Sequence, residues 1–120
     1  MNKENTHKLW KKYPNLYSGR WLSIQRSLIP FGFECGDGWY NLIDELSAKL
    51  EKLGVVAVQV KEKFGGLSFY IVGGSSEVYD LIDEAEQKSH ETCEVCGEKG
   101  KTNRKGWLKT LCESCKEKRN

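Results

Sequence analysis

Long hydrophobic runs are missing from this 120-residue sequence. No stretch approaches the roughly 18 apolar residues that a membrane-spanning helix needs, so we expect no membrane segment and no membrane partner. The first residues, MNKENTHKLWKKYP, contain no apolar core of the kind found in secretory signal peptides. Together these absences predict a cytoplasmic protein.

Histidine is also scarce, since the chain has only His7 and His90. A cysteine nucleophile usually needs a histidine base, and nothing in the sequence places either histidine near Cys35. Cys35 is therefore better explained as a small buried apolar residue. The sequence has no nucleophile–base signature, so we expect a protein that is not an enzyme.

A strong charge of one sign is absent, because the formal net charge is only +2. The distribution is uneven. Residues 1–26 carry six basic residues and one acidic residue. Residues 27–90 carry five basic and eleven acidic residues, and residues 91–120 carry eight basic and five acidic residues. Basic ends thus flank an acidic middle, which favours acidic partners but is also typical of ordinary solvated faces.

Three expected helices and a hairpin predict a mixed α+β fold. Apolar residues at three- and four-residue steps predict the middle helix, and alternating runs around Gly-Gly predict a hairpin. One hairpin cannot cover two helices alone, so we expect a third strand from residues 15–35, a dimer partner or help from the C-terminus. Within residues 15–35, Trp21, Ile24 and Leu28 also fit one helical face that Pro30 would end. The expected elements are helices at 3–12, 38–53 and 76–90 and a hairpin at 55–74.

The C-terminal cysteines show the spacing of a four-cysteine zinc site. Two Cys-x-x-Cys pairs are separated by fifteen residues, and each pair forms a turn with both sulfur atoms facing one point. Four such sulfurs suit tetrahedral zinc, and a closed site of this kind is structural. We therefore predict an α+β helix–hairpin–helix domain at 1–90 and a zinc ribbon or treble-clef-like unit at 91–120, with one structural zinc on Cys93, Cys96, Cys112 and Cys115.

The glycine-rich segment FECGDGW at residues 33–39 precedes the middle helix. Asp37 is positioned to cap that helix, and Gly36 and Gly38 suit a tight turn. The segment also suits a binding loop, because carboxylates accept hydrogen bonds from ribose hydroxyls and base amines. Both interpretations are open at this level.

A second segment, KEKFGG at residues 61–66, places two lysines and an aromatic ring at the hairpin tip. If the hairpin folds back over the helix, the two segments form one pocket for a phosphate-bearing or aromatic molecule, with lysines on phosphate and a ring on the base. A solvated turn is the alternative. The residues predicted to bind the ligand are Glu34, Asp37, Trp39, Lys61, Lys63, Phe64 and Tyr70.

These motifs support three hypotheses. The first is a non-enzymatic module that binds a small nucleotide-like ligand or a protein. The second is nucleic-acid binding by the zinc unit, where basic residues surround Trp107. The third is an enzyme with acid–base groups among the carboxylates and lysines of the two segments. The basic residues around Trp107 are Lys99, Lys101, Arg104, Lys105 and Lys109.

The sequence resembles a group of small, uncharacterised bacteriophage and prophage proteins. The shared motifs are KKYP, GFECGDGW, QVKEKFGGLxFY, TCEVCG and GW-x-x-TLC-x-x-C, which span nearly the whole chain. Ser68 stands where those proteins usually have arginine. The resemblance implies a host-cytoplasmic protein that interferes with a host process, including defence by a nucleotide signal, through a small ligand or a host protein. It implies no particular reaction.

Overall fold

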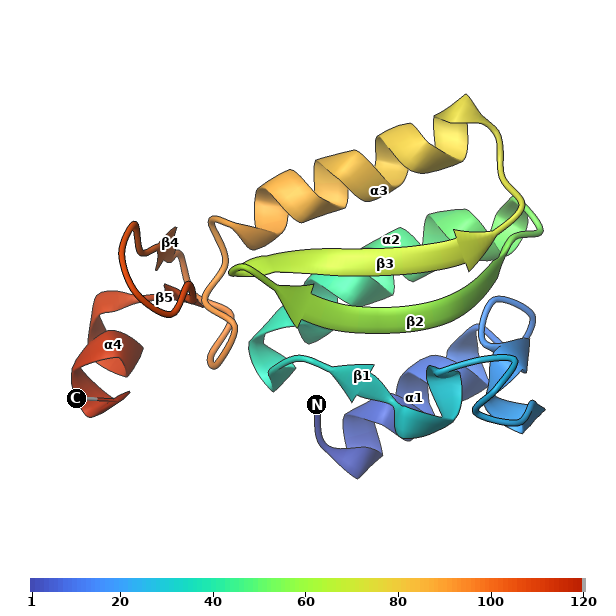
Figure 1. Cartoon of the computed structure of the whole chain (residues 1–120), viewed down its shortest axis with the longest axis horizontal. Helices are drawn as coiled ribbons and strands as arrows, with labels where there is room; N and C mark the ends of the chain where they lie inside the picture. The colour runs from blue at the N-terminus through green and yellow to red at the C-terminus, as the bar shows by residue number, and fades with distance from the viewer. Residues whose placement is uncertain (120) are drawn as a thin grey trace.

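The computed structural model describes residues 1–119 and has a mixed α+β architecture, which confirms the predicted class. Helices and strands form two layers, and a smaller C-terminal unit packs at one end of the sheet (Figure 1). None of the described helices is long and apolar enough to cross a membrane. The main elements are α1 (Lys3–Lys12), β1 (Phe33–Glu34), α2 (Tyr40–Lys52), β2 (Val56–Lys63), β3 (Gly66–Val72), α3 (Ser76–Ser89), β4 (Lys101–Thr102), β5 (Thr110–Leu111) and α4 (Glu113–Arg119).

The main sheet has three strands in the order β1-β2-β3. The short strand β1 pairs in parallel with β2, and β2 pairs antiparallel with β3. The third strand expected from residues 15–35 is therefore present, although it is only two residues long. Its register places Glu34 beside Lys61, so the first two residues of the FECGDGW segment are fixed along the edge of the hairpin.

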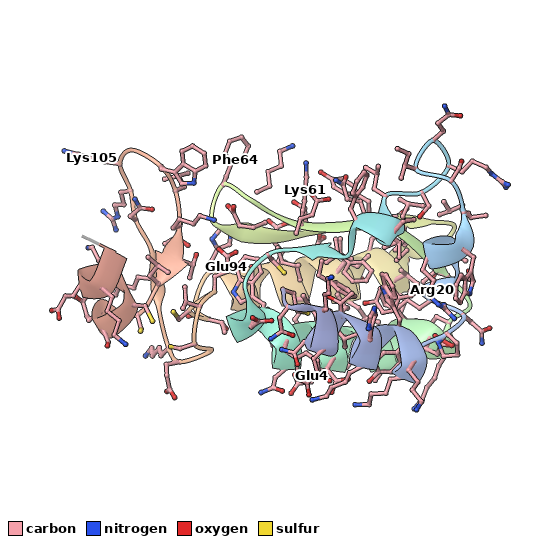
Figure 2. The ribbon with its side chains drawn as sticks, turned by 90° about the horizontal axis from the view of Figure 1, so that it is seen from below. Glu4, Arg20, Lys61, Phe64, Glu94 and Lys105 are labelled. Atoms are coloured by element: carbon pink, nitrogen blue, oxygen red, sulfur yellow. The ribbon has the colours of Figure 1, made fainter. Side chains whose placement is uncertain are left out.

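The three long helices lie on one face of the sheet (Figure 2). Alternation along the strands sends Val60, Leu67 and Phe69 into the core that these helices cover. The opposite row faces outward, and there Tyr70 is 41% exposed. One face of the sheet is thus open, and Lys61 projects from it in Figure 2.

The segment between α1 and β1 is not the helix that its apolar spacing suggested. It forms two short 3-10 turns, Ser18–Trp21 and Ile29–Phe31, joined by irregular backbone. Trp21 and Ile24 are 79% and 57% exposed, so they do not form a buried helical face. The prediction failed because Leu16, Tyr17 and Ile29 supply the core contacts of this segment instead.

A carboxylate of α2 anchors the end of α1. Asp44 accepts hydrogen bonds from the Tyr13 hydroxyl at 2.5 Å and from Lys12 Nζ at 2.9 Å. Burial raises the pKa of Asp44, but these two donors lower it more, and the net effect is a pKa below its ordinary value of 3.8. A lowered pKa stabilises the fold above that ordinary value, and the contribution is lost as the pH falls through the folded-state pKa.

We expect Tyr13→Phe to lower the free energy of unfolding by about 1 kcal/mol at neutral pH, because Asp44 loses its hydroxyl donor. The difference should narrow in acid, where Asp44 is protonated. Urea unfolding at both pH values measures this. Tyr79→Phe is the control, since that exposed hydroxyl makes only a 3.4 Å hydrogen bond. Equal stability of wild type and Tyr13→Phe at neutral pH would contradict the prediction.

Candidate metal centre and its contacts with the sheet

The four C-terminal cysteines come together at one point. Their sulfur atoms all lie within 4.8 Å of one another, as a single metal site requires. Cys93 is buried and Cys96 is exposed, so the cluster lies between the body of the protein and solvent. The strands β4 and β5 pair antiparallel, and α4 begins directly after Cys112, which brings the two Cys-x-x-Cys turns face to face.

The electrostatics of the cluster suit a cation. Burial raises the pKa of Cys93, but backbone N–H groups of Cys112, Cys96 and Val95 lower it more and bring it to about 6. Hydrogen bonding to Cys112, followed by burial, raises the pKa of Cys115 to about 12. Four thiolates at this separation repel one another, so full deprotonation needs a bound metal ion.

Two nearby groups are not part of the cluster. His90 Nδ1 lies 2.7 Å from the Thr102 hydroxyl, and this ring belongs to no metal-binding group among residues 1–119. Cys35 is buried in the core, and burial raises the pKa of its thiol to about 12. Cys35 therefore stays protonated, as expected for an apolar packing residue.

The FECGDGW loop packs directly against the first cysteine turn. Gly36 N donates to the Glu94 carboxylate and Gly38 N donates to the Glu94 carbonyl, both at 2.8 Å. A Cβ atom on Gly36 would lie 2.2 Å from the Glu94 carbonyl oxygen, and one on Gly38 would lie 2.2 Å from that of Cys93. Both positions thus need glycine because two backbones meet there.

The tip of the β2–β3 hairpin makes a second contact with the same unit. The Thr110 hydroxyl donates to the Gly65 carbonyl at 2.6 Å. A Cβ atom on Gly65 would lie 2.7 Å from the Thr102 methyl, and one on Gly66 would lie 2.4 Å from His90 Nε2. The glycines of KEKFGG therefore permit close packing of the cysteine unit on the hairpin.

Lys109 joins the two contacts. Its ammonium lies 2.9 Å from the Glu62 carboxylate and 3.3 Å from the Glu94 carboxylate. Burial lowers the pKa of Lys109, but the hydrogen bond to Glu62 and the charge of Glu94 raise it more, so the ammonium stays charged. Figure 2 shows Glu94 at the junction between the body and the C-terminal unit.

The residues predicted to form a ligand pocket do not line one cavity. Trp39 is completely buried and its indole N–H donates to the Thr92 carbonyl at 2.9 Å, so the prediction that it stacks on a base is wrong. Asp37 does not cap α2 and instead accepts hydrogen bonds from Asn2 and Asn5 of the α1 segment. The FECGDGW loop and the KEKFGG tip are two contacts of the cysteine unit, not two walls of a pocket.

The remaining predicted residues lie on the open side of the sheet. Glu34 accepts from Gln59 Nε2 at 3.4 Å, and the Lys61 ammonium lies 5.9 Å from the Tyr70 ring centre. Lys63 and Phe64 are exposed at the hairpin tip, where the ammonium lies 5.7 Å from the ring centre. These side chains share one face, but only Lys63 and Phe64 line the same cavity, which they form with the loop of the cysteine unit.

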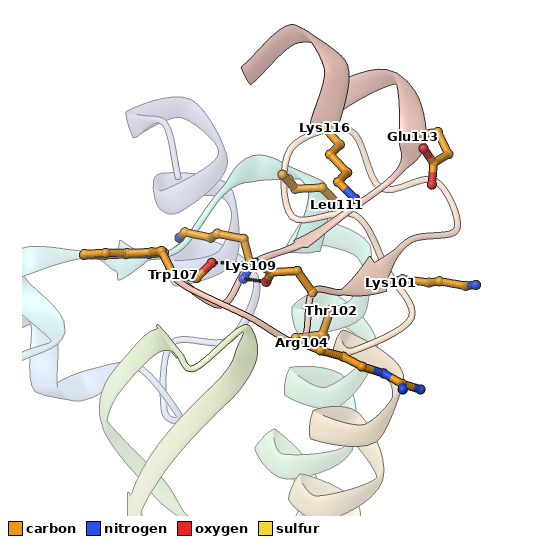
Figure 3. A pocket seen from close by; sticks show the side chains of 9 residues that line it. Lys101, Thr102, Arg104, Trp107, Lys109, Leu111, Glu113 and Lys116 are labelled. Carbon is orange, nitrogen blue, oxygen red and sulfur yellow. Dashed lines mark hydrogen bonds between the residues drawn. The ribbon is translucent and has the colours of Figure 1, made fainter. Parts of the chain in front are cut away.

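The C-terminal unit carries a basic groove of about 440 Å³ beside the cysteine cluster. Its side chains come from β4, the following loop, β5 and α4 (Figure 3). Asn103 and Lys116 of the groove were missed by the sequence analysis, because only the folded unit places α4 beside the loop. The lining residues are Lys101, Thr102, Asn103, Arg104, Trp107, Lys109, Leu111, Glu113 and Lys116.

Comparison of the chain with protein-family models, with curated proteins and with solved structures gives no significant match.

Proposed function

We propose that the protein binds nucleic acid through the basic groove of a zinc-stabilised C-terminal unit. Zinc is the metal that four cysteine sulfurs suit best, and four sulfur ligands leave no open coordination position. The metal then holds β4, β5 and α4 in place and does no chemistry. In this proposal the protein is a cytoplasmic binding protein and not an enzyme.

The charge of the groove is the observation that carries the proposal. Four of the side chains lining it are cations and only Glu113 is a carboxylate. Lys109 is ion-paired inside the protein, but Lys101, Arg104 and Lys116 make no ion pair with any of residues 1–119. Three unpaired cations beside an exposed tryptophan suit a phosphate backbone with bases next to it.

The groove favours this function over a pocket made by the two glycine-rich segments. Those segments pack against the cysteine unit through hydrogen bonds with Glu94 and Thr110. Asp37, Glu62 and the glycines of these segments are therefore explained by folding, whereas the unpaired cations of the groove, Lys101, Arg104 and Lys116, are not.

The double variant Lys101→Glu/Arg104→Glu tests the proposal. We expect it to bind a single-stranded oligonucleotide more weakly, and the slope of log K against log salt to become less steep by about 1.4, because two phosphate contacts are lost. Fluorescence anisotropy over a range of salt concentrations measures both quantities. Mass spectrometry of the intact protein checks that the metal content is unchanged.

The matched control is Lys3→Glu/Lys49→Glu, which changes the net charge equally on exposed positions of α1 and α2. It should leave the salt slope as in wild type. If both double variants lose the same affinity for the oligonucleotide, the effect is due to net charge alone, and the proposal that the groove is the binding site is wrong. Binding that is indifferent to salt would overturn nucleic-acid recognition altogether.

A further inference from the structure

We infer that Phe64 and Trp107 form a stacking site for an unpaired base, so that the protein prefers single-stranded nucleic acid to duplex. This inference rests on the proposed function and adds the class of strand that the groove accepts. It concerns a second cavity, of about 490 Å³, between the hairpin tip and the loop at residues 104–108.

The two rings are unusually open to solvent. Phe64 is 70% exposed and Trp107 is 75% exposed, although both are large apolar side chains. They come from segments more than forty residues apart, and both line the same cavity. Trp107 also lines the basic groove, so the two cavities meet at this one side chain. A strand with phosphates in the groove has its bases next to the aromatic cavity.

Both sides of the cavity are held in place before any ligand binds. The hairpin tip is fixed by the hydrogen bond from Thr110 to Gly65. The loop is fixed by Asn103, whose amide donates to the carbonyls of Lys105 and Trp107 at 2.8 and 2.9 Å and accepts from Lys109 N at 2.7 Å. A cavity whose walls are already ordered loses less conformational entropy on binding.

The backbone at Phe64 is a further sign of function. Phe64 and Gly65 form the two-residue turn between β2 and β3, with φ of +53° and +85°. Such turns favour asparagine or glycine at the first position, and Phe64 is the only residue other than glycine with positive φ in the described chain. An exposed phenylalanine in this conformation costs stability, and burial of its ring offsets little of that cost because most of the ring is in solvent.

Charge complementarity identifies the occupant. Glu62 and Lys63 both belong to the cavity lining. The Glu62 carboxylate is paired with Lys109 at 2.9 Å, whereas Lys63 makes no ion pair within the described part of the chain, and Lys105 lies in the adjoining loop. Figure 2 shows Lys61, Phe64 and Lys105 projecting from the same side of the molecule, opposite Glu4. Aromatic rings with lysines around them bind the bases and phosphates of single strands, whose base faces are open, whereas a duplex keeps its base faces stacked.

The experiment compares an oligothymidylate with a duplex on the full, metal-loaded chain. We expect wild type to bind the single strand more tightly, and Phe64→Asn and Trp107→Ala each to weaken that binding about tenfold. Duplex binding should stay unchanged in Phe64→Asn, because Phe64 lies outside the basic groove. Phe64→Asn should also raise the melting temperature by about 4 °C, because asparagine suits the turn. A loss of binding in a more stable variant cannot be due to unfolding.

The outcomes separate this inference from the proposed function. If wild type binds single strands and duplex equally and Phe64→Asn has no effect on either, the inferred stacking site is refuted, but nucleic-acid binding by the basic groove is not. If wild type binds neither nucleic acid, both proposals fail. If Phe64→Asn weakens single-strand and duplex binding alike, the ring does not recognise an unpaired base and the inference is overturned.

Discussion

Cys93→Ser is expected to abolish metal binding and to unfold the C-terminal unit. The unit has two strands of two residues each and a seven-residue helix, so without a metal it has too little core to stay folded. Structural zinc contributes on the order of 10 kcal/mol in small zinc-binding units, which makes this the largest effect we predict. Native mass spectrometry should find one zinc per chain in wild type and none in the variant.

The effect should spread into the body of the protein. Gly36, Gly38 and Gly65 lose their hydrogen-bond partners when the unit unfolds. Amide hydrogen exchange should therefore accelerate in residues 33–39 and at the hairpin tip, and a chelator should reproduce the result in wild type. Cys35→Ala is the control, since Cys35 lies outside the cluster and the variant should keep its zinc. A Cys93→Ser protein with a full complement of zinc would refute the four-cysteine site.

The second large effect is expected from Gly38→Ala. The added Cβ atom would lie 2.2 Å from the carbonyl oxygen of Cys93 and 2.6 Å from the carbonyl carbon of Glu94. Both atoms belong to the backbone, so no side-chain rotation can relieve the contact. We expect the C-terminal cysteine unit to move away from the FECGDGW loop. The free energy of unfolding should then fall by about 1–3 kcal/mol, as it does in overpacked cores. Chemical denaturation measures the loss.

Metal content distinguishes this variant from a cysteine variant. All four cysteines lie within the C-terminal unit, so Gly38→Ala should keep its zinc although the unit is displaced. Gly54→Asn is the matched control, because Gly54 has φ of +73° and no atom within 4 Å of the added Cβ, and asparagine tolerates this conformation. If Gly38→Ala is as stable as Gly54→Asn, the loop does not pack tightly against the cysteine turn.

Much of the fold is predictable because its signals are local. The helix expected at 38–53 is α2 at Tyr40–Lys52, and the hairpin expected at 55–74 contains β2 and β3. In each case a repeated apolar pattern within one segment decides the structure. The segment at 15–35 was predicted only in part, because its strand of two residues depends on pairing with β2 and has no pattern of its own.

The metal site is also predictable from a local signal, the spacing of the cysteines. The structural role of the glycines, in contrast, depends on tertiary contacts. A glycine suits a turn, a binding loop and a close backbone approach equally well. Gly36 and Glu94 are 58 residues apart, and only the folded chain shows that they touch. Likewise, the sequence shows Phe64 and Trp107 as separate aromatic residues, and the packing of the cysteine unit on the hairpin places both beside one cavity.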